Sequence, residues 1–256
     1  MLRTLLGGAL IVYGGFALVL YVKQRSFIYF PVPAIEHAYP VEQVRSGEEL
    51  IEMVVLNGTA EHAVIYFGGN AESVVANARQ FADAFPKLAV YLVNYRGYGR
   101  SSGKPTEQGL YADARVIFDL LRDRHHGISV IGRSLGTGVA TYLAANRPVE
   151  KLILVTPFDS ILSIAKDQFP FFPVSLALKD HYDSHGRVKK IDAPTLILVA
   201  EHDGIVSAKY SDRLINAFPA GQARVEVLKG AGHNGLSMHD DYMPLMADFL
   251  DSSGKG

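Results

Sequence analysis

The chain alternates between short apolar runs and longer segments in which apolar residues recur every three or four positions. The short runs, which predict buried strands, cover residues 50–56, 63–67, 88–94, 128–131, 151–156, 194–200 and 224–228. The periodic segments predict helices over residues 71–85, 107–124 and 137–146, and one more helix that ends near Phe218. Strands that alternate with helices in this way are typical of an α/β fold, with a mostly parallel central sheet and helices on both faces.

The regular alternation pauses between residues 160 and 188. Phe169, Phe171 and Phe172 lie in this segment and are interleaved with two prolines. Prolines restrict the backbone, so we expect the three rings to form a stiff apolar surface that binds substrate, suited to an acyl chain. The alternative, that the rings only pack the segment onto the domain, stays open. A segment of about 30 residues is too short for a deep enclosing lid, so we expect a fairly open site.

An uninterrupted apolar run occupies the N-terminus from Leu5 to Val22. It contains 18 residues without a charged side chain. As a helix it would span about 27 Å at roughly 1.5 Å per residue, close to the hydrocarbon thickness of a bilayer. We therefore predict a membrane anchor over residues 1–24 and one globular domain over residues 25–256. A cleaved secretory signal with Arg3 as its basic flank is the alternative, although no persuasive small-x-small cleavage site precedes Lys23.

The charges that flank this run leave the side of the membrane undetermined. Arg3 and the amino terminus lie at one end, and Lys23 and Arg25 lie at the other. The positive-inside rule therefore has almost no charge difference to act on. The sequence therefore predicts a membrane location with a single N-terminal anchor, but it does not predict on which side of the membrane the domain lies.

The pattern G-R-S-L-G at residues 132–136 is the strongest chemical signal in the chain. It follows a predicted strand directly and precedes a predicted helix. In a nucleophile elbow, small residues two positions before and after the serine permit a sharp strand-to-helix turn that exposes the hydroxyl. The pattern alone is weak evidence, but this context predicts that Ser134 is a catalytic nucleophile.

A serine nucleophile needs a base and a carboxylate, which in this arrangement follow it in the order acid and then histidine. Asp203 lies just after the strand at 194–200, and His233 lies in a glycine-flanked loop just after the strand at 224–228. We expect these two residues to complete a Ser-His-Asp triad with Ser134. The alternatives that stay open are Asp159 or Glu201 as the acid and His202 as the base.

Catalysis by such a triad also requires donors for the oxyanion that forms on the attacked carbonyl. One donor is expected to be the backbone N–H of Leu135, just after the nucleophile. The other is expected to be the backbone N–H of Asn70, which follows two glycines at the end of the strand at 63–67. A helix-capping role for Asn70 is compatible with this assignment.

Two arginines near these motifs are expected to have structural roles. Arg96 lies in a glycine-rich loop after the strand at 88–94, where we expect it to pair with a buried carboxylate. Arg133 directly precedes the nucleophile, and a salt bridge within the scaffold is favoured over contact with substrate.

Taken together, the motifs resemble those of the α/β-hydrolase superfamily. They are F-G-G-N-A at residues 67–71, N-Y-R-G-Y-G-R-S-S-G at 94–103, G-R-S-L-G at 132–136, the Asp203 loop and G-A-G-H-N at 230–234. Over residues 25–250 the chain is similar to the single-pass, membrane-anchored branch of serine hydrolases, which includes depalmitoylase-like and serine aminopeptidase-like domains. Many relatives have histidine where this chain has Gly68, which excludes a side-chain role there but not a backbone oxyanion hole. The resemblance implies an α/β-hydrolase fold, with residues 160–188 as a short cap over the site.

Composition and charge narrow the range of functions. With 256 residues, 48% of them hydrophobic, the chain can bury a large single core. A net charge of −1 and the lack of a basic run are evidence against nucleic acid as a partner. The absence of cysteine excludes disulfides, cysteine metal sites and thiol catalysis. No phosphate-binding loop or helical metal-ligand spacing occurs, so we expect neither a cofactor nor a bound metal.

The sequence therefore predicts a membrane-tethered serine hydrolase that cleaves a carboxylic ester or an acyl thioester. The expected partners are a small-molecule or lipid-like acyl substrate and the membrane. A short-chain esterase or peptidase is the first alternative. A hydrolase fold that serves as a non-catalytic membrane-bound interaction module is the second, and a cofactor-free perhydrolase with the same triad is the third.

Overall fold

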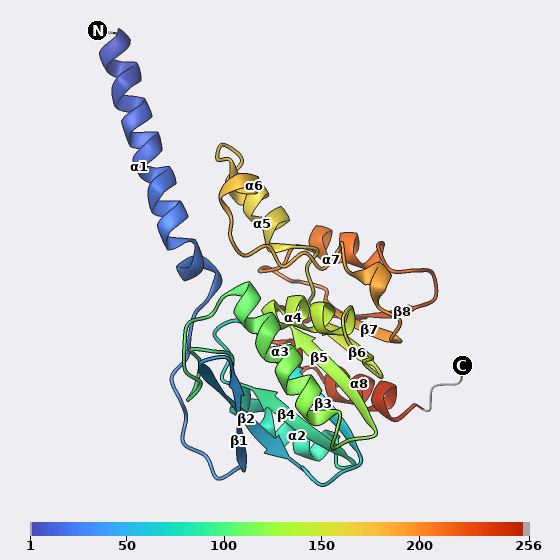
Figure 1. The fold of residues 1–256 in the computed structure, drawn as a ribbon. Coiled ribbons are helices and arrows are strands. Elements are labelled where there is room, and N and C mark those ends of the chain that lie inside the picture. The colour runs from blue at the N-terminus through green and yellow to red at the C-terminus, as the bar shows by residue number, and fades with distance from the viewer. Residues whose placement is uncertain (1, 253–256) are drawn as a thin grey trace.

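The computed structural model of the chain, which describes residues 2–252, is built around one eight-stranded sheet (Figure 1). The strands are β1 (Val41–Ser46), β2 (Glu49–Leu56), β3 (His62–Phe67), β4 (Leu88–Val93), β5 (Gly127–Arg133), β6 (Leu152–Val155), β7 (Thr195–Ala200) and β8 (Ala223–Leu228). Their order across the sheet is β1-β2-β4-β3-β5-β6-β7-β8. Only β2 runs antiparallel to its neighbours, β1 and β4, and the other adjacent pairs are parallel. The predicted α/β class with a mostly parallel sheet is confirmed.

Helices pack against both faces of the sheet (Figure 1). One face carries α3 (Glu107–Leu121), α4 (Leu135–Ala144) and α7 (Ala208–Ile215), and the other carries α2 (Ala78–Ala84) and α8 (Tyr242–Asp251). Successive residues of a strand point to opposite faces, so Ile65 of β3 packs with the first group and Tyr66 with the second. The central strands are therefore buried on both sides, which is why they read as continuous apolar runs in the sequence.

Several elements differ from the sequence-based expectation. The hairpin partner of β2, strand β1, was not predicted, because only one of its three less exposed residues, Val44, is apolar; the other two are Glu42 and Ser46. The helix predicted over residues 71–85 is shorter: a 3-10 turn η1 (Val74–Asn77) precedes α2. Ala71 has a positive φ of 57°, which is incompatible with a right-handed helix at that position. The helix at 107–124 ends at Leu121, and the helix predicted from Thr137 begins at Leu135.

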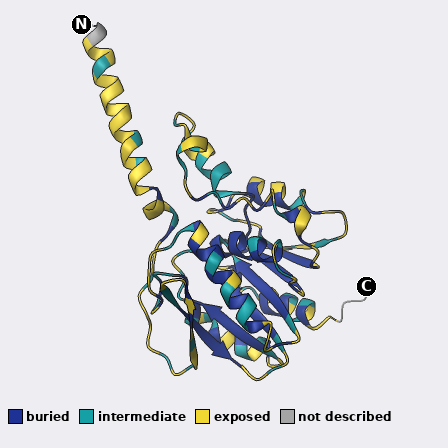
Figure 2. Ribbon diagram, in the orientation of Figure 1, coloured by how far each residue is buried: buried dark blue, intermediate teal, exposed yellow. Residues whose placement is uncertain are grey.

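The N-terminal run forms one continuous helix, α1 (Leu2–Ile28), that projects from the domain with most of its surface exposed (Figure 2). The helix passes the predicted boundary at residue 24 without a break. Among the described residues, the segment Thr4–Ile28 is the one helix with the length and apolar composition to cross a membrane. A membrane anchor is thus a role that this helix is suited to by its dimensions.

The irregular region after β6 forms a small cap beside α1 (Figure 1). It consists of α5 (Ile161–Gln168), the short helix α6 (Val174–Ala177) and the 3-10 turn η2 (Val188–Lys190). Gln24 of α1 is buried against the cap, where its side-chain amide donates to the carbonyl of Ala177 at 3.2 Å and accepts from the amide of Lys179 at 2.7 Å. Arg25 forms an ion pair with the buried Asp180 at 2.8 Å. The base of α1 is therefore fixed to the cap.

Candidate active site

The turn between β5 and α4 holds Ser134 in a strained backbone conformation. Its φ of 49° and ψ of −115° lie outside the regions that residues other than glycine usually adopt. The turn is held by a hydrogen bond of 2.8 Å from the Ser134 amide to the carbonyl of Val155 and by two donors from Thr137 to the Ser134 carbonyl. Such a turn exposes the serine hydroxyl at the carboxyl end of the sheet.

The two glycines that flank Ser134 are required by close backbone contacts. A Cβ atom on Gly132 would lie 2.5 Å from the carbonyl oxygen of Gly136. A Cβ atom on Gly136 would lie only 2.0 Å from the carbonyl oxygen of Phe67, at the end of β3. The small residues of the G-x-S-x-G pattern therefore allow α4 to start directly against β3 and β5.

Three side chains from separate loops meet at this turn. His233, in the loop after β8, has its Nε2 atom 3.1 Å from the Oγ atom of Ser134. The Nδ1 atom of His233 lies 2.8 Å from the Oδ2 atom of Asp203, in the loop after β7. His233 and Asp203 are buried. The structure thus brings the three residues that the sequence singled out into one hydrogen-bonded chain.

The environment of Asp203 favours its ionised form. Burial alone would raise the pKa of this carboxyl, but hydrogen bonds from His233 and from the amides of Val206 and Ile205 outweigh that effect. The pKa of Asp203 is therefore below its ordinary value. A carboxylate that stays charged beside Nδ1 favours the tautomer with the proton on Nδ1, which leaves Nε2 free to accept a proton from serine.

The alternative acids and base are engaged elsewhere. Asp159 accepts hydrogen bonds from the amide of Ser160 and the hydroxyl of Ser163, at the start of α5. Glu201 accepts from the amide of Gly230 at 2.7 Å. His202 is exposed and faces Glu201 at 3.6 Å. None of these three makes a hydrogen bond to Ser134 or His233 within residues 2–252.

Asn70 and Leu135 line the same cavity as Ser134. Leu135 is the first residue of α4, so no carbonyl of a preceding helical turn accepts a hydrogen bond from its N–H. No hydrogen bond among the described residues engages the N–H of Asn70. Its side chain, in contrast, is engaged at both ends, because Nδ2 donates to the carbonyl of Ile28 and Oδ1 accepts from the amide of Phe30 and the hydroxyl of Tyr98. Two unengaged amides therefore lie in the cavity wall beside the nucleophile.

A buried ion pair supports the loop that carries Asn70. Arg133 faces Glu72 at 3.0 Å, and the side chains are only 13% and 10% exposed. Glu72 also accepts hydrogen bonds from the amide of Gly69 and the hydroxyl of Tyr66, both at 2.6 Å. Arg133 extends further to the carbonyl of His233 at 3.5 Å. The pair therefore links the Asn70 loop to the His233 loop, which agrees with the scaffold role expected for Arg133.

Comparison with known proteins identifies the family. The family described as alpha/beta hydrolase fold matches residues 62–176. An uncharacterised protein of Mycobacterium tuberculosis is 34% identical over 254 residues, which cover 93% of this chain and 90% of the relative. The human alpha/beta hydrolase domain-containing protein 17B is 31% identical over 75% of this chain and 67% of its own length. The chain belongs to the α/β-hydrolase family.

Solved structures show the same fold for this α/β-hydrolase. A CIB-like hydrolase from Thermoplasma acidophilum superposes with a TM-score of 0.62 and 21% sequence identity, over 83% of this chain and 98% of the other. The similarity supports the architecture alone. The substrate has to be inferred from the site itself.

The cavity of this hydrolase has a volume of about 350 Å³ and extends from Ser134 along the cap. Phe169 and Phe172, two of the three residues expected to bind substrate, line it. Phe171, the third, does not line it, and its side chain is 84% exposed. In a turn between two prolines, adjacent rings point in different directions, and only two of the three face inward.

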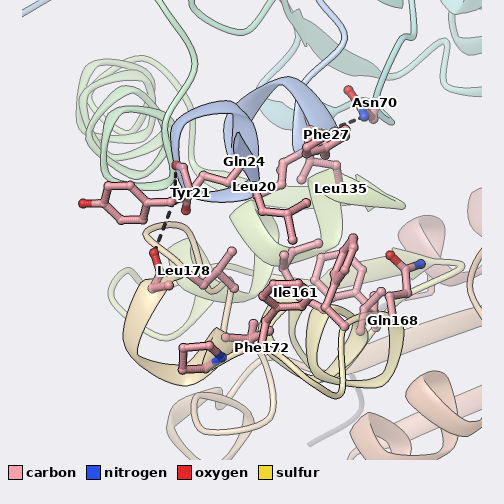
Figure 3. A pocket seen from close by; sticks show the side chains of 18 of the residues that line it. Leu20, Tyr21, Gln24, Phe27, Asn70, Leu135, Ile161, Gln168, Phe172 and Leu178 are labelled. Carbon is pink, nitrogen blue, oxygen red and sulfur yellow. Dashed lines mark hydrogen bonds between the residues drawn. The ribbon is translucent and has the colours of Figure 1, made fainter. Parts of the chain in front are cut away.

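The other wall of the cavity was not predicted, because it belongs to α1 (Figure 3). Six residues of this helix line the cavity: Ala17, Leu20, Tyr21, Gln24, Phe27 and Ile28. Several of them recur at intervals of three or four, which places them on one face of the helix. The sequence did not indicate this cavity-lining face, because the run Leu5–Val22 has no charged residues that would mark an opposite, solvent-facing side.

Proposed function

We propose that this α/β-hydrolase cleaves carboxylic esters or acyl thioesters with an apolar acyl group through Ser134, His233 and Asp203. The observation that carries the proposal is the hydrogen-bonded chain of 3.1 Å and 2.8 Å that opens into an apolar cavity. A charged, buried Asp203 and a strained serine turn support it, because both are features that serine hydrolases use to activate the hydroxyl.

In the first half of the reaction the acyl group passes to the enzyme. His233 Nε2 takes the proton from the Ser134 hydroxyl while Oγ attacks the carbonyl carbon, and the carbonyl oxygen becomes an oxyanion. The N–H groups of Leu135 and Asn70 stabilise this oxyanion. When the intermediate collapses, the bond to the alcohol or thiol breaks, and the leaving group takes the proton from His233.

In the second half water releases the acid. His233 removes a proton from a water molecule, which attacks the acyl carbon of the Ser134 ester. The second oxyanion is held by the same two amides and collapses with return of the proton to Oγ. Asp203 remains ionised throughout and stabilises the imidazolium that forms in each half.

The cavity lining favours an acyl chain as the group bound next to Ser134. Its walls are mainly aliphatic and aromatic, and the volume of about 350 Å³ is at the lower end of the range for small-molecule sites, roughly 300–1,000 Å³. We further propose that α1 anchors the protein in a membrane, which would keep the cavity next to lipid-like substrates. A short-chain esterase, a peptidase, a perhydrolase and a non-catalytic module are the alternatives that the experiment below must exclude.

The test is a series of acyl esters and acyl thioesters graded by chain length, assayed with the full-length protein in detergent and with Ser134→Ala. The proposal expects kcat/KM to rise from acetyl to longer chains, and turnover to be lost in the variant. A preference for acetyl would favour a short-chain esterase. No turnover of any ester, thioester or peptide, and no peroxide-dependent activity, would favour the interaction module.

A further inference from the structure

We propose that the tip of the cap, residues 169–178, inserts into the membrane beside α1, so that the catalytic cavity opens sideways to acyl chains within the bilayer. Entry of acyl chains as substrates rests on the proposed hydrolase function. Insertion of the tip does not rest on that function, because it depends only on how the cap lies against α1.

The contact between the cap and α1 sets the depth of the tip. The ring of Phe172 stacks on Tyr13 at a centroid distance of 4.9 Å and lies 5.4 Å from Phe16. The Tyr13 hydroxyl donates to the carbonyl of Phe171 at 2.7 Å. Tyr13 is nine residues before Val22, the last residue of the uncharged run, which corresponds to about 14 Å along a helix. If α1 crosses a bilayer with a hydrocarbon core of about 30 Å, the cap tip lies at the depth of the acyl chains.

The surface of the tip is suited to that depth. Residues 169–178 contain no charged side chain and no histidine, and Ser175 is their one polar residue. Phe171 and Leu176 project outward with 84% and 90% of their surface exposed. Large apolar side chains that project from a folded domain next to an apolar helix are typical of a membrane-binding surface. No protein surface among the described residues covers either side chain.

The charged residues that flank the tip are at its base. Asp167, before the tip, pairs with Lys209 of α7 at 2.8 Å. After it, the Lys179 ammonium lies 4.4 Å from the ring of Tyr21. Tyr21 precedes the charges Lys23 and Arg25 at the end of the uncharged run. Aromatic rings and basic groups at one level are typical of the lipid headgroup region. On the Lys179 side of the tip, the change from apolar to charged therefore occurs at the same height on α1 and on the cap.

The cavity runs along this same interface. It begins at Ser134 and extends to Ala17 on α1 and Phe172 on the cap. Ala17 lies five residues inside the uncharged run, about 7 Å from its end. The opening of the cavity between α1 and the cap therefore faces hydrocarbon, and an acyl chain can enter it without crossing water.

The direct test uses single cysteines, because the chain contains none of its own. Full-length Ser134→Ala protein carrying Phe171→Cys or Leu176→Cys is labelled with the fluorophore NBD and reconstituted in phosphatidylcholine vesicles that contain doxyl-labelled acyl chains. Ile11→Cys on α1 is the control for lipid contact, and the exposed Asp123→Cys after α3 is the control for water. We expect positions 171 and 176 to be quenched like position 11, with position 123 unquenched. Quenching at position 11 alone, or at none of the four, would overturn insertion of the tip.

A second measurement links insertion to activity. Leu176→Asp, with Leu176→Val as its matched control, is assayed on a long-chain acyl thioester in vesicles and on a soluble short-chain ester. We expect Leu176→Asp to lose about tenfold in rate on the vesicle substrate only, because a charge replaces a leucine that contacts lipid. Equal rates for the two variants on vesicles would contradict the proposal. If the tip is quenched by lipid but the wild type cleaves neither substrate, insertion stands and the hydrolase function fails.

Discussion

The side-chain amide of Asn70 donates a hydrogen bond of 2.7 Å to the carbonyl of Ile28, the last residue of α1. Its Oδ1 atom accepts from the amide of Phe30 and the hydroxyl of Tyr98, both at 2.9 Å. The residue proposed to donate its main-chain N–H to the oxyanion is therefore held in place by the exit of the N-terminal helix. The position of α1 and the geometry of the oxyanion loop are coupled through one side chain.

Asn70→Ala is expected to lower kcat about tenfold with little change in KM, because the loop loses its attachment and the N–H is less well aimed at the oxyanion. The measurement is steady-state kinetics on the best acyl substrate. Asn146→Ala is the matched control, since Asn146 also donates from its amide to a carbonyl, that of Tyr142, but on the exposed side of α4. A rise in KM with unchanged kcat would show that Asn70 contributes only to substrate binding.

Arg133→Met is expected to lower the free energy of unfolding by about 3 kcal/mol, because it leaves the buried carboxylate of Glu72 without its counter-ion. Arg224→Met is the control, since Arg224 is 47% exposed in its ion pair with Glu226 and should contribute less than about 1 kcal/mol. Denaturant unfolding of the variants in detergent measures both values. Equal losses would mean that the Arg133 pair does not stabilise the site, and Glu72→Gln in the Arg133→Met background should recover part of the loss.

Gly136→Ala is expected to lower the free energy of unfolding by about 1–3 kcal/mol, the usual effect of overpacking. The reason is that the added Cβ collides with the carbonyl of Phe67. Gly204→Ala is the matched control, since a Cβ there meets nothing within 4 Å. Thermal unfolding of the two variants gives the comparison. A Gly136→Ala protein as stable as the control would show that the start of α4 can shift away from β3.

Asp203 should make stability depend on pH in the acid range. Its pKa is lower in the folded chain than in an unfolded one, where an aspartate titrates near about 3.9. The unfolded state therefore binds the proton first, and the carboxylate contributes stability that is present above about pH 4 and lost as the pH falls through its folded pKa. The difference in unfolding free energy between wild type and Asp203→Asn should shrink as the pH falls below about 4. A difference that grows on acidification would contradict this sign.

Much of the fold was predictable because local pattern and long-range structure agree. Strands β3 to β7 are buried on both faces, so each produces an apolar run that depends little on its neighbours. The loops that carry Ser134 and Asp203 each follow such a strand, and the loop that carries His233 follows the parallel edge strand β8. In a parallel sheet the carboxyl ends of strands lie at one edge. Sequence order alone therefore indicated that these three residues would be neighbours.

The features that the sequence did not predict depend on tertiary contacts, which produce no periodic pattern of apolar residues. The run Leu5–Val22 of α1 has no charged residue on any side, so nothing in its sequence marks Leu20 as facing the cap. Phe171 and Phe172 are chemically identical neighbours, and only the path of the chain between two prolines decides which ring faces the cavity. Ala71 lies outside the helix predicted there because of its positive φ, a conformation that alanine rarely adopts and that composition does not indicate.

The proposed role of Ser134 as the nucleophile can be tested by labelling with a fluorophosphonate probe, which reacts with activated serine hydroxyls. Wild-type protein, Ser134→Ala, and Ser207→Ala as a control serine outside the site are treated with the probe, digested and examined by mass spectrometry. We expect phosphonylation of the peptide that contains Ser134 in wild type and in Ser207→Ala, and no label in Ser134→Ala. An unlabelled wild type, or equal labelling of Ser134→Ala, would contradict it.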